Sequence, residues 1–359
     1  MARRPSDEPR RGRGANENPD GRFEAETRSW VDDGWNEAAS EAPEPLKTEV
    51  RASTPRSVLS GNDSPDIPFR LSINPYQGCE HGCSYCYARP AHAYLGLSPG
   101  LDFETRLVAK TGAAEVLARE LGRRGHQVSP VALGANTDPY QPVERRLRIT
   151  REILEVLAEA RHPVVVITKN ALVERDIDLL ASLAEYRAAR VFLSITSLDS
   201  ELSRRLEPRA SRPARRVETI RRLSDAGIPA GVMFAPVIPA LNEHELEAVL
   251  EAAAGAGARY AGYVVLRLPQ EVRPLFKRWL EDHEPLKAAR VMAIVRELRG
   301  GRENDSSFGR RLVGEGPFAD LLRQRFRVTC RRLGLDSRPP ELDASQFRPP
   351  GPAGQRSLF

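Results

Sequence analysis

From about residue 65 onward, short β-prone runs alternate with helical patterns, and this alternation restricts the possible fold more than any other feature of the sequence. Repeated βα units pack their strands into a parallel sheet and their helices against it. Six runs have the composition of such strands: residues 69–73, 130–133, 163–168, 190–195, 230–235 and 260–266. These units predict an α/β fold, an open and partial (β/α)6 barrel of the TIM type.

Between the strands, Leu, Ile and Val recur every three or four residues, most clearly at residues 147–160, 176–186, 215–226 and 243–254. This period is typical of helices with one apolar face. Beyond residue 270, segments 288–298 and 318–333 have the same pattern and predict a C-terminal helical cap on the barrel. The expected organisation is an N-terminal extension (1–64), a core barrel (65–270), a C-terminal helical region (271–337) and a tail (338–359).

The two ends of the chain differ in composition from the core. Residues 1–64 are rich in Arg, Glu, Asp, Pro, Ser and Gly without sustained periodicity, which predicts a disordered arm, and the Pro- and Gly-rich tail is predicted to be flexible. No apolar run approaches the ~20 residues of a membrane helix, and the Arg-rich start lacks the apolar segment of a secretory signal. We therefore expect a cytoplasmic protein with no membrane partner.

Three of the four cysteines, Cys79, Cys83 and Cys86, fall within eight consecutive positions. Four cysteines are too few for a disulfide framework, so metal ligation explains this cluster better. Spacings of four and three allow three thiolates to hold three corners of a [4Fe–4S] cluster, and Gly78 and Gly82 allow tight turns around it. The loop follows the first strand, and active sites of parallel α/β folds lie at such strand ends.

In this arrangement one iron has no protein ligand. An open iron can bind the amino and carboxylate groups of S-adenosylmethionine (SAM) and pass one electron to its sulfonium. The alternative is a zinc site that adds His81 or His92 to the three thiols. All three thiols come from one loop and no second cysteine pair follows, which favours the iron–sulfur cluster. The fourth cysteine, Cys330, lies in a helical pattern and is predicted to be buried packing.

The motif Cys79-x3-Cys83-x2-Cys86, with Tyr85 before the third cysteine, resembles that of the radical SAM superfamily. The stretch from His81 to Tyr87 and the strand-end pairs Thr168-Lys169, Ser194-Ile195 and Ala235-Pro236 resemble the spore photoproduct lyase branch. More closely still, the chain resembles an uncharacterised group of bacterial proteins within that branch, over nearly its whole length.

This resemblance implies a [4Fe–4S] cluster and SAM as cofactors, an external one-electron reductant and a 5′-deoxyadenosyl radical. It implies that the Tyr85 carbonyl lies near the adenine, Lys169 near the methionine carboxylate and Ser194 near the ribose. It also places Ala235 among the strand-end residues that contact SAM. Lys169 as a solvated charge and Ser194 as a turn donor are the alternatives.

Tyr85 and Tyr87 match the two tyrosines that, in the lyase, help to return a hydrogen atom toward SAM; packing aromatics are the alternative. The lyase has a hydrogen-donating cysteine at the end of the second strand, and the matching residue here is Ala135. Reversal of a thymine dimer by the same route is therefore in doubt. Asn136 and the two residues after it either contact SAM or substrate, or shape a turn.

Charge and the extreme C-terminus indicate possible macromolecular partners. The overall excess of 54 Lys and Arg over 49 acidic residues is small, but residues 204–222 hold eight arginines against Glu207 and Glu218. This segment either binds a nucleic-acid backbone or is a solvated face. The end of the chain, Gln355 to Phe359, resembles the peptide that binds the bacterial sliding clamp, with a sticky tail end as the alternative.

These features predict a radical SAM enzyme that acts on nucleic acid, in DNA repair or modification. A radical SAM enzyme acting on a peptide or small metabolite is the first alternative. A non-catalytic clamp-associated module with a structural zinc is the second.

Overall fold

The computed structural model describes residues 12–23 and 46–350. Within these residues a seven-stranded sheet has the order β10-β9-β8-β7-β6-β3-β2, and its strands are parallel except for β2. The strands are β2 (Ser60–Gly61), β3 (Leu71–Ile73), β6 (Val131–Leu133), β7 (Val164–Thr168), β8 (Ala189–Ser194), β9 (Ala230–Val237) and β10 (Tyr260–Val265). The six predicted parallel strands and the α/β fold class are thereby confirmed.

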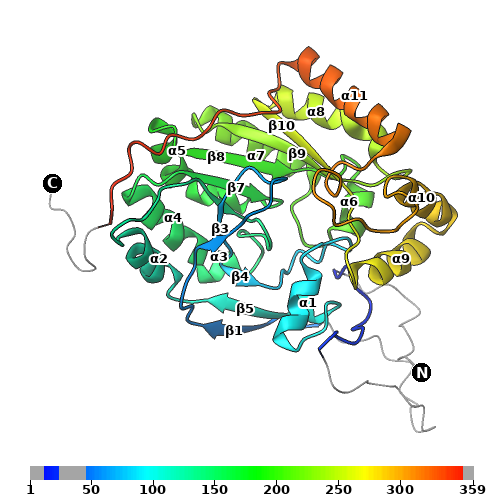
Figure 1. The fold of residues 1–359 in the computed structure, drawn as a ribbon, viewed down its shortest axis with the longest axis horizontal. Helices are drawn as coiled ribbons and strands as arrows, with labels where there is room; N and C mark the ends of the chain where they lie inside the picture. Colours follow the sequence, from blue (N-terminus) through cyan, green and yellow to red (C-terminus); the bar gives the residue numbers. More distant parts are fainter. Residues whose placement is uncertain (1–11, 24–45, 351–359) are drawn as a thin grey trace, which may run out of the picture.

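Helices follow the strands in sequence and cover the sheet (Figure 1). They are α2 (Ala113–Leu121), α3 (Glu144–Leu147), α4 (Ile149–Glu159), α5 (Ile177–Glu185), α6 (Ser200–Leu206), α7 (Pro213–Asp225) and α8 (Leu246–Gly255). Short 3-10 helices precede α5 and α8: η2 (Ala171–Asp176) and η3 (Glu243–Glu245). The strands are runs of Val, Ile, Leu and Ala because both of their faces are covered, and Val164 and Val166 are fully buried.

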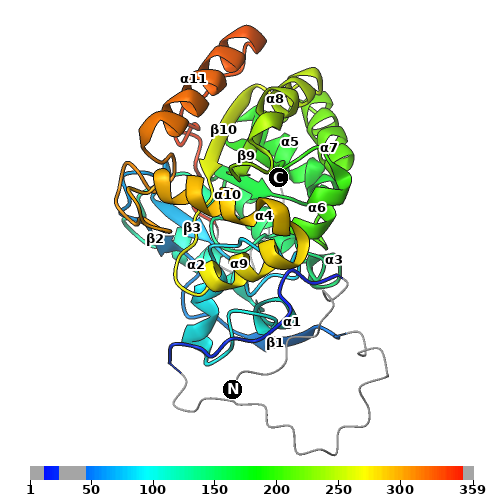
Figure 2. The same ribbon diagram turned by 90° about the vertical axis from the view of Figure 1, so that its right-hand side faces the viewer.

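The two edges of the sheet are joined by a loop. Strand β10 lies at one edge and β2 at the other, and no strand of the described residues pairs with both. The Val265 amide donates to the Leu312 carbonyl at 2.8 Å, while the Gly309 amide and the Arg311 guanidinium each donate to Asp66 at 2.6 Å. Figure 2 shows this orange segment beside β2. The barrel is thus a partial one, bridged on its open side.

A second sheet, with three strands, lies below the seven-stranded sheet in the view of Figure 1. Its strands are β1 (Glu49–Ser53), β5 (Arg106–Lys110) and β4 (Tyr76–Gln77), and α1 (Asp102–Thr105) immediately precedes β5. Strand β1 belongs to the segment expected to be disordered. Its side chains are mostly exposed, so its sequence lacks the apolar alternation that indicates a strand, and β5 supplies the pairing.

Residues 12–23, here called the N-terminal strap, also differ from the expected disordered arm. The Leu101 amide donates to the Glu17 carbonyl at 3.1 Å, and Asn18 and Asp102 bond through both backbone and side chain. Arg22 pairs with Glu271 at 2.6 Å. These contacts are polar and join the strap to residues far away in the sequence, which is why an argument from apolar periodicity misses the strap.

The C-terminal helices take two positions. Helices α9 (Val272–His283) and α10 (Pro285–Glu297) pack with α6 and with the cysteine loop in one apolar cluster, as the predicted cap requires. Helix α11 (Gly316–Leu333) packs on α8 and on β10, where Phe326 and Tyr263 have ring centroids 4.8 Å apart. Cys330 on α11 is buried in the main core, as predicted.

The tail beyond α11, red in Figure 1, runs past α8 and α5 toward α4. It has no regular element between residues 338 and 350, but it is attached to the barrel. Arg190 donates to the Pro340 carbonyl at 2.6 Å, and the Arg348 amide donates to the Ala160 carbonyl at 2.9 Å. The motif Gln355–Phe359 lies outside the described residues. No helix of the described residues is long and apolar enough to span a membrane.

Candidate active site

The three clustered cysteines lie in the loop between β4 and η1 (Arg89–Leu95), at the carboxyl-end side of β3. Cys79 and Cys83 are buried and Cys86 is partly buried, and none of them forms a disulfide. The Cys79 amide donates to the Phe103 carbonyl at 2.8 Å, and the Cys86 amide donates to the Cys83 carbonyl at 3.3 Å. Backbone hydrogen bonds within the loop and to α1 therefore fix its conformation.

Two glycines allow this loop to turn. Gly78 and Gly82 have φ angles of 79° and 66°, in the left-handed region that side chains disfavour. A Cβ atom on Gly78 would lie 2.9 Å from the Phe103 carbonyl oxygen, and one on Gly82 would lie 2.6 Å from a Glu104 carboxylate oxygen. Both positions therefore require glycine for conformation and for space.

The chemistry of the three thiols fits an iron–sulfur cluster. Burial raises the pKa of all three, and the charges of Asp138, Cys83 and Cys86 raise that of Cys79 further, which places the thiols within electrostatic reach of one another. Thiolates in such a dry site need a bound cationic centre to balance their charge, and ferric iron supplies one. Cys79, Cys83 and Cys86 are therefore the residues that fit a cluster.

His81, one of the two histidines of the zinc alternative, has other partners. Its Nδ1 lies 3.4 Å from Asp138, and its Nε2 lies 3.0 Å from the Asn170 side-chain nitrogen. Among the described residues, no group of three or more His, Cys, Asp and Glu side chains, the three cysteines included, is arranged around a single metal ion, as the zinc alternative requires. A [4Fe–4S] cluster binds each thiolate to a different iron and does not need that arrangement. With both ring nitrogens engaged, His81 belongs to a hydrogen-bond network.

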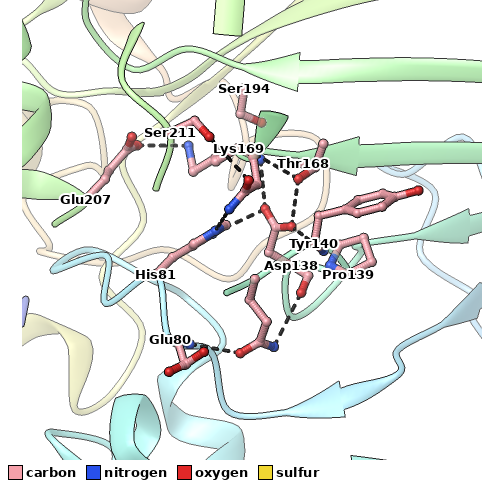
Figure 3. A network of polar contacts seen from close by, with 12 residues as sticks. Glu80, His81, Asp138, Pro139, Tyr140, Thr168, Lys169, Ser194, Glu207 and Ser211 are labelled. Carbon is pink, nitrogen blue, oxygen red and sulfur yellow. Dashed lines mark hydrogen bonds and ion pairs between the residues drawn. The ribbon is translucent and has the colours of Figure 1, made fainter. Parts of the chain in front are cut away.

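Asp138 is the centre of that network (Figure 3). Its carboxylate accepts hydrogen bonds from the Thr168 hydroxyl and the Lys169 amide, each at 2.7 Å. Burial opposes ionisation of Asp138, but His81 and these donors together lower its pKa. The carboxylate thus fastens the cysteine loop to the end of β7, and the Tyr140 amide donates to it at 2.9 Å to shape the following turn.

Tyr85 is buried against a charged cluster. Its hydroxyl donates to the Glu207 carboxylate and lies 3.1 Å from the Thr196 hydroxyl. Glu207 is itself buried and pairs with Arg216 and, at 3.0 Å, with the Lys169 ammonium. Burial raises the pKa of Glu207, but the charges of Arg216 and Lys169 outweigh it and hold this pKa far below its usual range. Glu207 is therefore an anion.

The predicted SAM-binding residues of β7, β8 and β9 come together around this cluster. The Lys169 ammonium also donates to the Ala235 carbonyl at 3.0 Å and to the Thr196 hydroxyl at 3.2 Å. The Ser194 carbonyl accepts a hydrogen bond from Arg216 at 2.8 Å. The carboxyl ends of three neighbouring parallel strands thus meet beside Tyr85.

Tyr87 lies on the other side of the loop, with its side chain directed toward β6. Its hydroxyl donates to the Ala135 carbonyl, and its side chain stays 46% exposed. The neighbouring Asn136 amide donates to the Asn74 side chain at 3.0 Å. The structure therefore separates the two predicted tyrosines: Tyr85 is enclosed, and Tyr87 faces the mouth of the barrel.

The N-terminal strap braces the cysteine loop from outside. The Glu104 carboxylate accepts hydrogen bonds from the backbone amides of Gly14 and Ala15 at 3.1 and 2.9 Å. A Cβ on Gly14 would lie 1.6 Å from the Gly82 carbonyl oxygen, so the strap backbone lies directly on the loop. The fully buried Arg89 bonds both Glu104 and the Cys83 carbonyl. The loop is held between the strap and the barrel.

Comparison with known proteins decides the family. A profile of the Radical SAM superfamily matches residues 73–253. The chain is 36% identical over 285 residues to the uncharacterised protein Rv2578c of Mycobacterium tuberculosis, which covers 78% of this chain and 80% of that protein. The chain belongs to the radical SAM superfamily. The cofactors of this superfamily are a [4Fe–4S] cluster and SAM.

More distant relatives and solved structures agree with this assignment. The uncharacterised protein MJ0683 of Methanocaldococcus jannaschii is 26% identical over 213 residues, covering 59% of this chain and 76% of that protein. Spore photoproduct lyase complexed with dinucleoside spore photoproduct matches with a TM-score of 0.57 and 16% identity, covering 80% of each chain. At this identity the likeness shows the fold alone.

In this radical SAM chain, Glu207 is the site residue that sequence reasoning missed. Glu207 lies 122 positions from Tyr85 and 38 positions from Lys169 in the sequence, so no local pattern connects the three residues. The sequence offered one signal for Glu207: it is an acidic residue among the arginines of residues 204–222. That position indicated only a negative charge on a basic surface, not a buried residue of the site. Thr196 was missed as a site residue for the same reason, whereas His81 was considered from the sequence only as a ligand of the zinc alternative.

The arginine-rich segment of this radical SAM protein is largely paired within the chain. Seven of its eight arginines form ion pairs with carboxylates of the described residues. Arg216 is buried, and Arg209 and Arg205 pair with Glu80 and Glu284, each at 2.9 Å. This pairing favours the structural alternative for the segment over a dedicated phosphate-binding face.

Proposed function

We propose that this chain holds a [4Fe–4S] cluster on Cys79, Cys83 and Cys86, cleaves SAM reductively and acts on nucleic acid. The observation that carries the proposal is the meeting of the three-thiol loop with the carboxyl ends of β7, β8 and β9. When bound, the cluster supplies the electron from an external reductant that splits SAM into methionine and a 5′-deoxyadenosyl radical. We assign this activity to the core at residues 65–270, which the helical region at residues 271–337 partly covers.

The strand-end residues are suited to bind SAM. Lys169 carries a positive charge to the mouth of the barrel, where the methionine carboxylate needs one, and it would exchange one of its internal acceptors for that carboxylate. Ser194 and Asn136 have side-chain groups with no partner among the described residues, which leaves them free to bond the ribose or amino acid. The carbonyls of Tyr85 and Ala235 are the acceptors proposed for the adenine side.

Tyr87 is the proposed hydrogen-transfer residue. Its exposed ring faces the mouth, and its hydroxyl lies on the carbonyl of Ala135, where the lyase branch carries its hydrogen-donating cysteine. A phenol at that place offers an O–H to a product radical in the absence of a thiol. Tyr85, whose hydroxyl donates to Glu207 inside the protein, is better suited to positioning than to direct transfer.

The decisive experiment is anaerobic reconstitution followed by measurement of iron, acid-labile sulfide and 5′-deoxyadenosine. The unmodified chain should bind a reducible cluster and release 5′-deoxyadenosine from SAM when a strong reductant is added. Cys83→Ala should abolish both. Cys330→Ala is the matched control, because it removes a buried thiol on α11 outside the site, and it should retain both. SAM cleavage that survives Cys83→Ala would refute the assignment.

The substrate is tested separately. Turnover of SAM is compared with irradiated DNA, with RNA, with peptides and with cell metabolites as additions. Stimulation by nucleic acid, together with binding that weakens steeply as salt rises, supports the proposal. Stimulation by a peptide or metabolite alone would move the radical chemistry to that substrate. Binding of a sliding clamp through Gln355–Phe359 stays a prediction, testable by comparing the full chain with a Phe359→Ala variant.

A further inference from the structure

Arg267 is the second residue after β10, at the carboxyl end of the last strand of the barrel. Its neighbours Leu266 and Leu268 are buried in the apolar cluster that contains α9 and α10. The Arg267 guanidinium instead lies over the Tyr87 ring, 5.5 Å from the ring centroid. A cation from the last strand thus reaches the one predicted site residue that faces the mouth.

The guanidinium of Arg267 forms no ion pair with a carboxylate of the described residues, and Asp66, the acidic residue whose charge reaches it, is paired with Arg311. Within the described part of the chain the Arg267 guanidinium makes no hydrogen bond or ion pair, although its Nε atom is buried. Burial and the charge of Arg311 both act against its ionised form and lower its pKa. A partly buried guanidinium without a partner is costly to the folded state, and a bound anion offsets that cost. Two buried arginines with structural roles do have acceptors: Arg216 pairs with the Glu207 carboxylate, and Arg299 donates to backbone carbonyls.

The surroundings of Arg267 are basic and firmly built. The buried Arg299 donates to the Leu266 carbonyl at 2.8 Å and to the Arg310 carbonyl at 2.9 Å, so it fixes the backbone just before Arg267. Arg311 is paired with Asp66 at 2.6 Å. The charges of Arg267 and Arg299 therefore add to a positive potential at this side of the mouth.

We propose that Arg267 binds a phosphate of the substrate backbone, beside the base that stacks on or near Tyr87. This rests on the proposed action on nucleic acid and names the residue that recognises it. A guanidinium presents two parallel N–H donors that match two phosphate oxygens, and an exposed aromatic ring beside a cation is the pairing that single-stranded nucleic acid uses. Seven of the eight arginines at 204–222 are paired with carboxylates of the described residues, whereas Arg267 is not.

The test is binding of a fluorescein-labelled single-stranded decanucleotide to the reconstituted protein, measured by anisotropy over a range of salt concentrations. Arg267→Gln should weaken binding about tenfold or more, as the loss of one charge-assisted contact predicts. It should also reduce the slope of log affinity against log salt by about 0.7, the value for one phosphate on a single strand. Arg267→Lys keeps the charge without the fork and should recover part of the affinity.

Arg259→Gln is the matched control. Arg259 precedes β10, at the opposite end of the same strand, and its side chain is exposed, so its removal changes the net charge equally. Binding should be nearly unchanged. A decanucleotide with uncharged methylphosphonate linkages should not distinguish Arg267→Gln from the unmodified chain.

Three results would overturn the inference. Equal weakening by Arg267→Gln and Arg259→Gln would reduce the effect to net charge. Unchanged binding by Arg267→Gln, with nucleic acid still bound, would refute the role of Arg267 and leave the proposed function standing. Absence of decanucleotide binding to the unmodified chain, or binding only of an acidic peptide that depends on Arg267, would refute both the phosphate and the nucleic-acid substrate. The assay of SAM cleavage does not depend on any of these binding results, so the cofactor chemistry is tested separately from the substrate.

Discussion

Replacement of Glu207 by Gln tests the buried charged cluster at the centre of the site. Glu207→Gln keeps the size and one acceptor oxygen but removes the negative charge that Arg216 and Lys169 share. Arg216 is 1% exposed and Glu207 fully buried, so water cannot replace the lost partner. Breaking a buried ion pair from one side costs about 3–5 kcal/mol, because the remaining charge stays buried and uncompensated.

The same substitution has a signature in the pH dependence of stability. The pKa of Glu207 is lower in the folded chain than its unfolded value of about 4.3. Its stabilising contribution is therefore complete above that unfolded value and is lost as pH falls below it toward the folded pKa. At pH 3 most of the unfolded chain has bound the proton and the folded chain has not, which removes about 2 kcal/mol of the contribution. Gln has no such dependence.

The assay is urea unfolding of the chain and its variants followed by circular dichroism at pH 7 and pH 3. We expect the free energy of unfolding of Glu207→Gln to be about 3–5 kcal/mol lower than that of the unmodified chain at pH 7, and this gap to narrow by about 2 kcal/mol at pH 3. Glu251→Gln is the control, because Glu251 pairs with Arg332 on the surface, with side chains about half exposed. Its gap should be small at both pH values. A gap for Glu207→Gln that is no larger than the control, or that does not change with pH, would refute the reasoning.

Two further predictions concern the strap and a buried histidine. Gly14→Ala places a methyl group on the Gly82 carbonyl and should loosen the cysteine loop, so that the visible absorbance of the reconstituted cluster is lost faster in air. Gly61→Ala, which has open space around it, is the control and should not change the rate of loss. Equal rates for the two variants would show that the strap does not brace the loop. Burial lowers the pKa of His162 to about 4, so stability should decline as pH falls from about 6.5, by at most about 3 kcal/mol at pH 4. His162→Gln should lessen this decline in urea unfolding, unlike the exposed His244→Gln; parallel curves for all three proteins would contradict it.

The parallel strands were predictable from the sequence because both of their faces are covered. Residues 164–168 form an apolar run ending in Thr that only a buried strand explains, and the structure has β7 there. Strand β1 escaped prediction because its side chains are mostly exposed, so nothing in residues 49–53 alternates. Residues 49–53 form a strand because they pair in parallel with β5, so the information that makes them a strand lies in residues 106–110. Pattern arguments find elements that burial organises, and miss those organised by pairing alone.

The site divides in the same way. Cys79, Cys83 and Cys86 are close in sequence, so their spacing already indicates their chemistry. The strand-end residues were placed by resemblance, and the structure brings Lys169 and the Ala235 carbonyl within 3.0 Å. Glu207 could not be found, because its meaning depends on long-range partners that only the fold brings together.

The arginines show most clearly why local charge is a weak guide to binding. Residues 204–222 hold eight arginines, yet several of their partners come from distant elements, such as Glu80 in the cysteine loop and Glu174 in η2. Arg267 lies between two leucines, and no sequence pattern indicates a function for it. In the structure it is the arginine that reaches the mouth without a carboxylate among the described residues. What marks a cation for ligand binding is the absence of an internal partner at a buried place, and that property belongs to the fold.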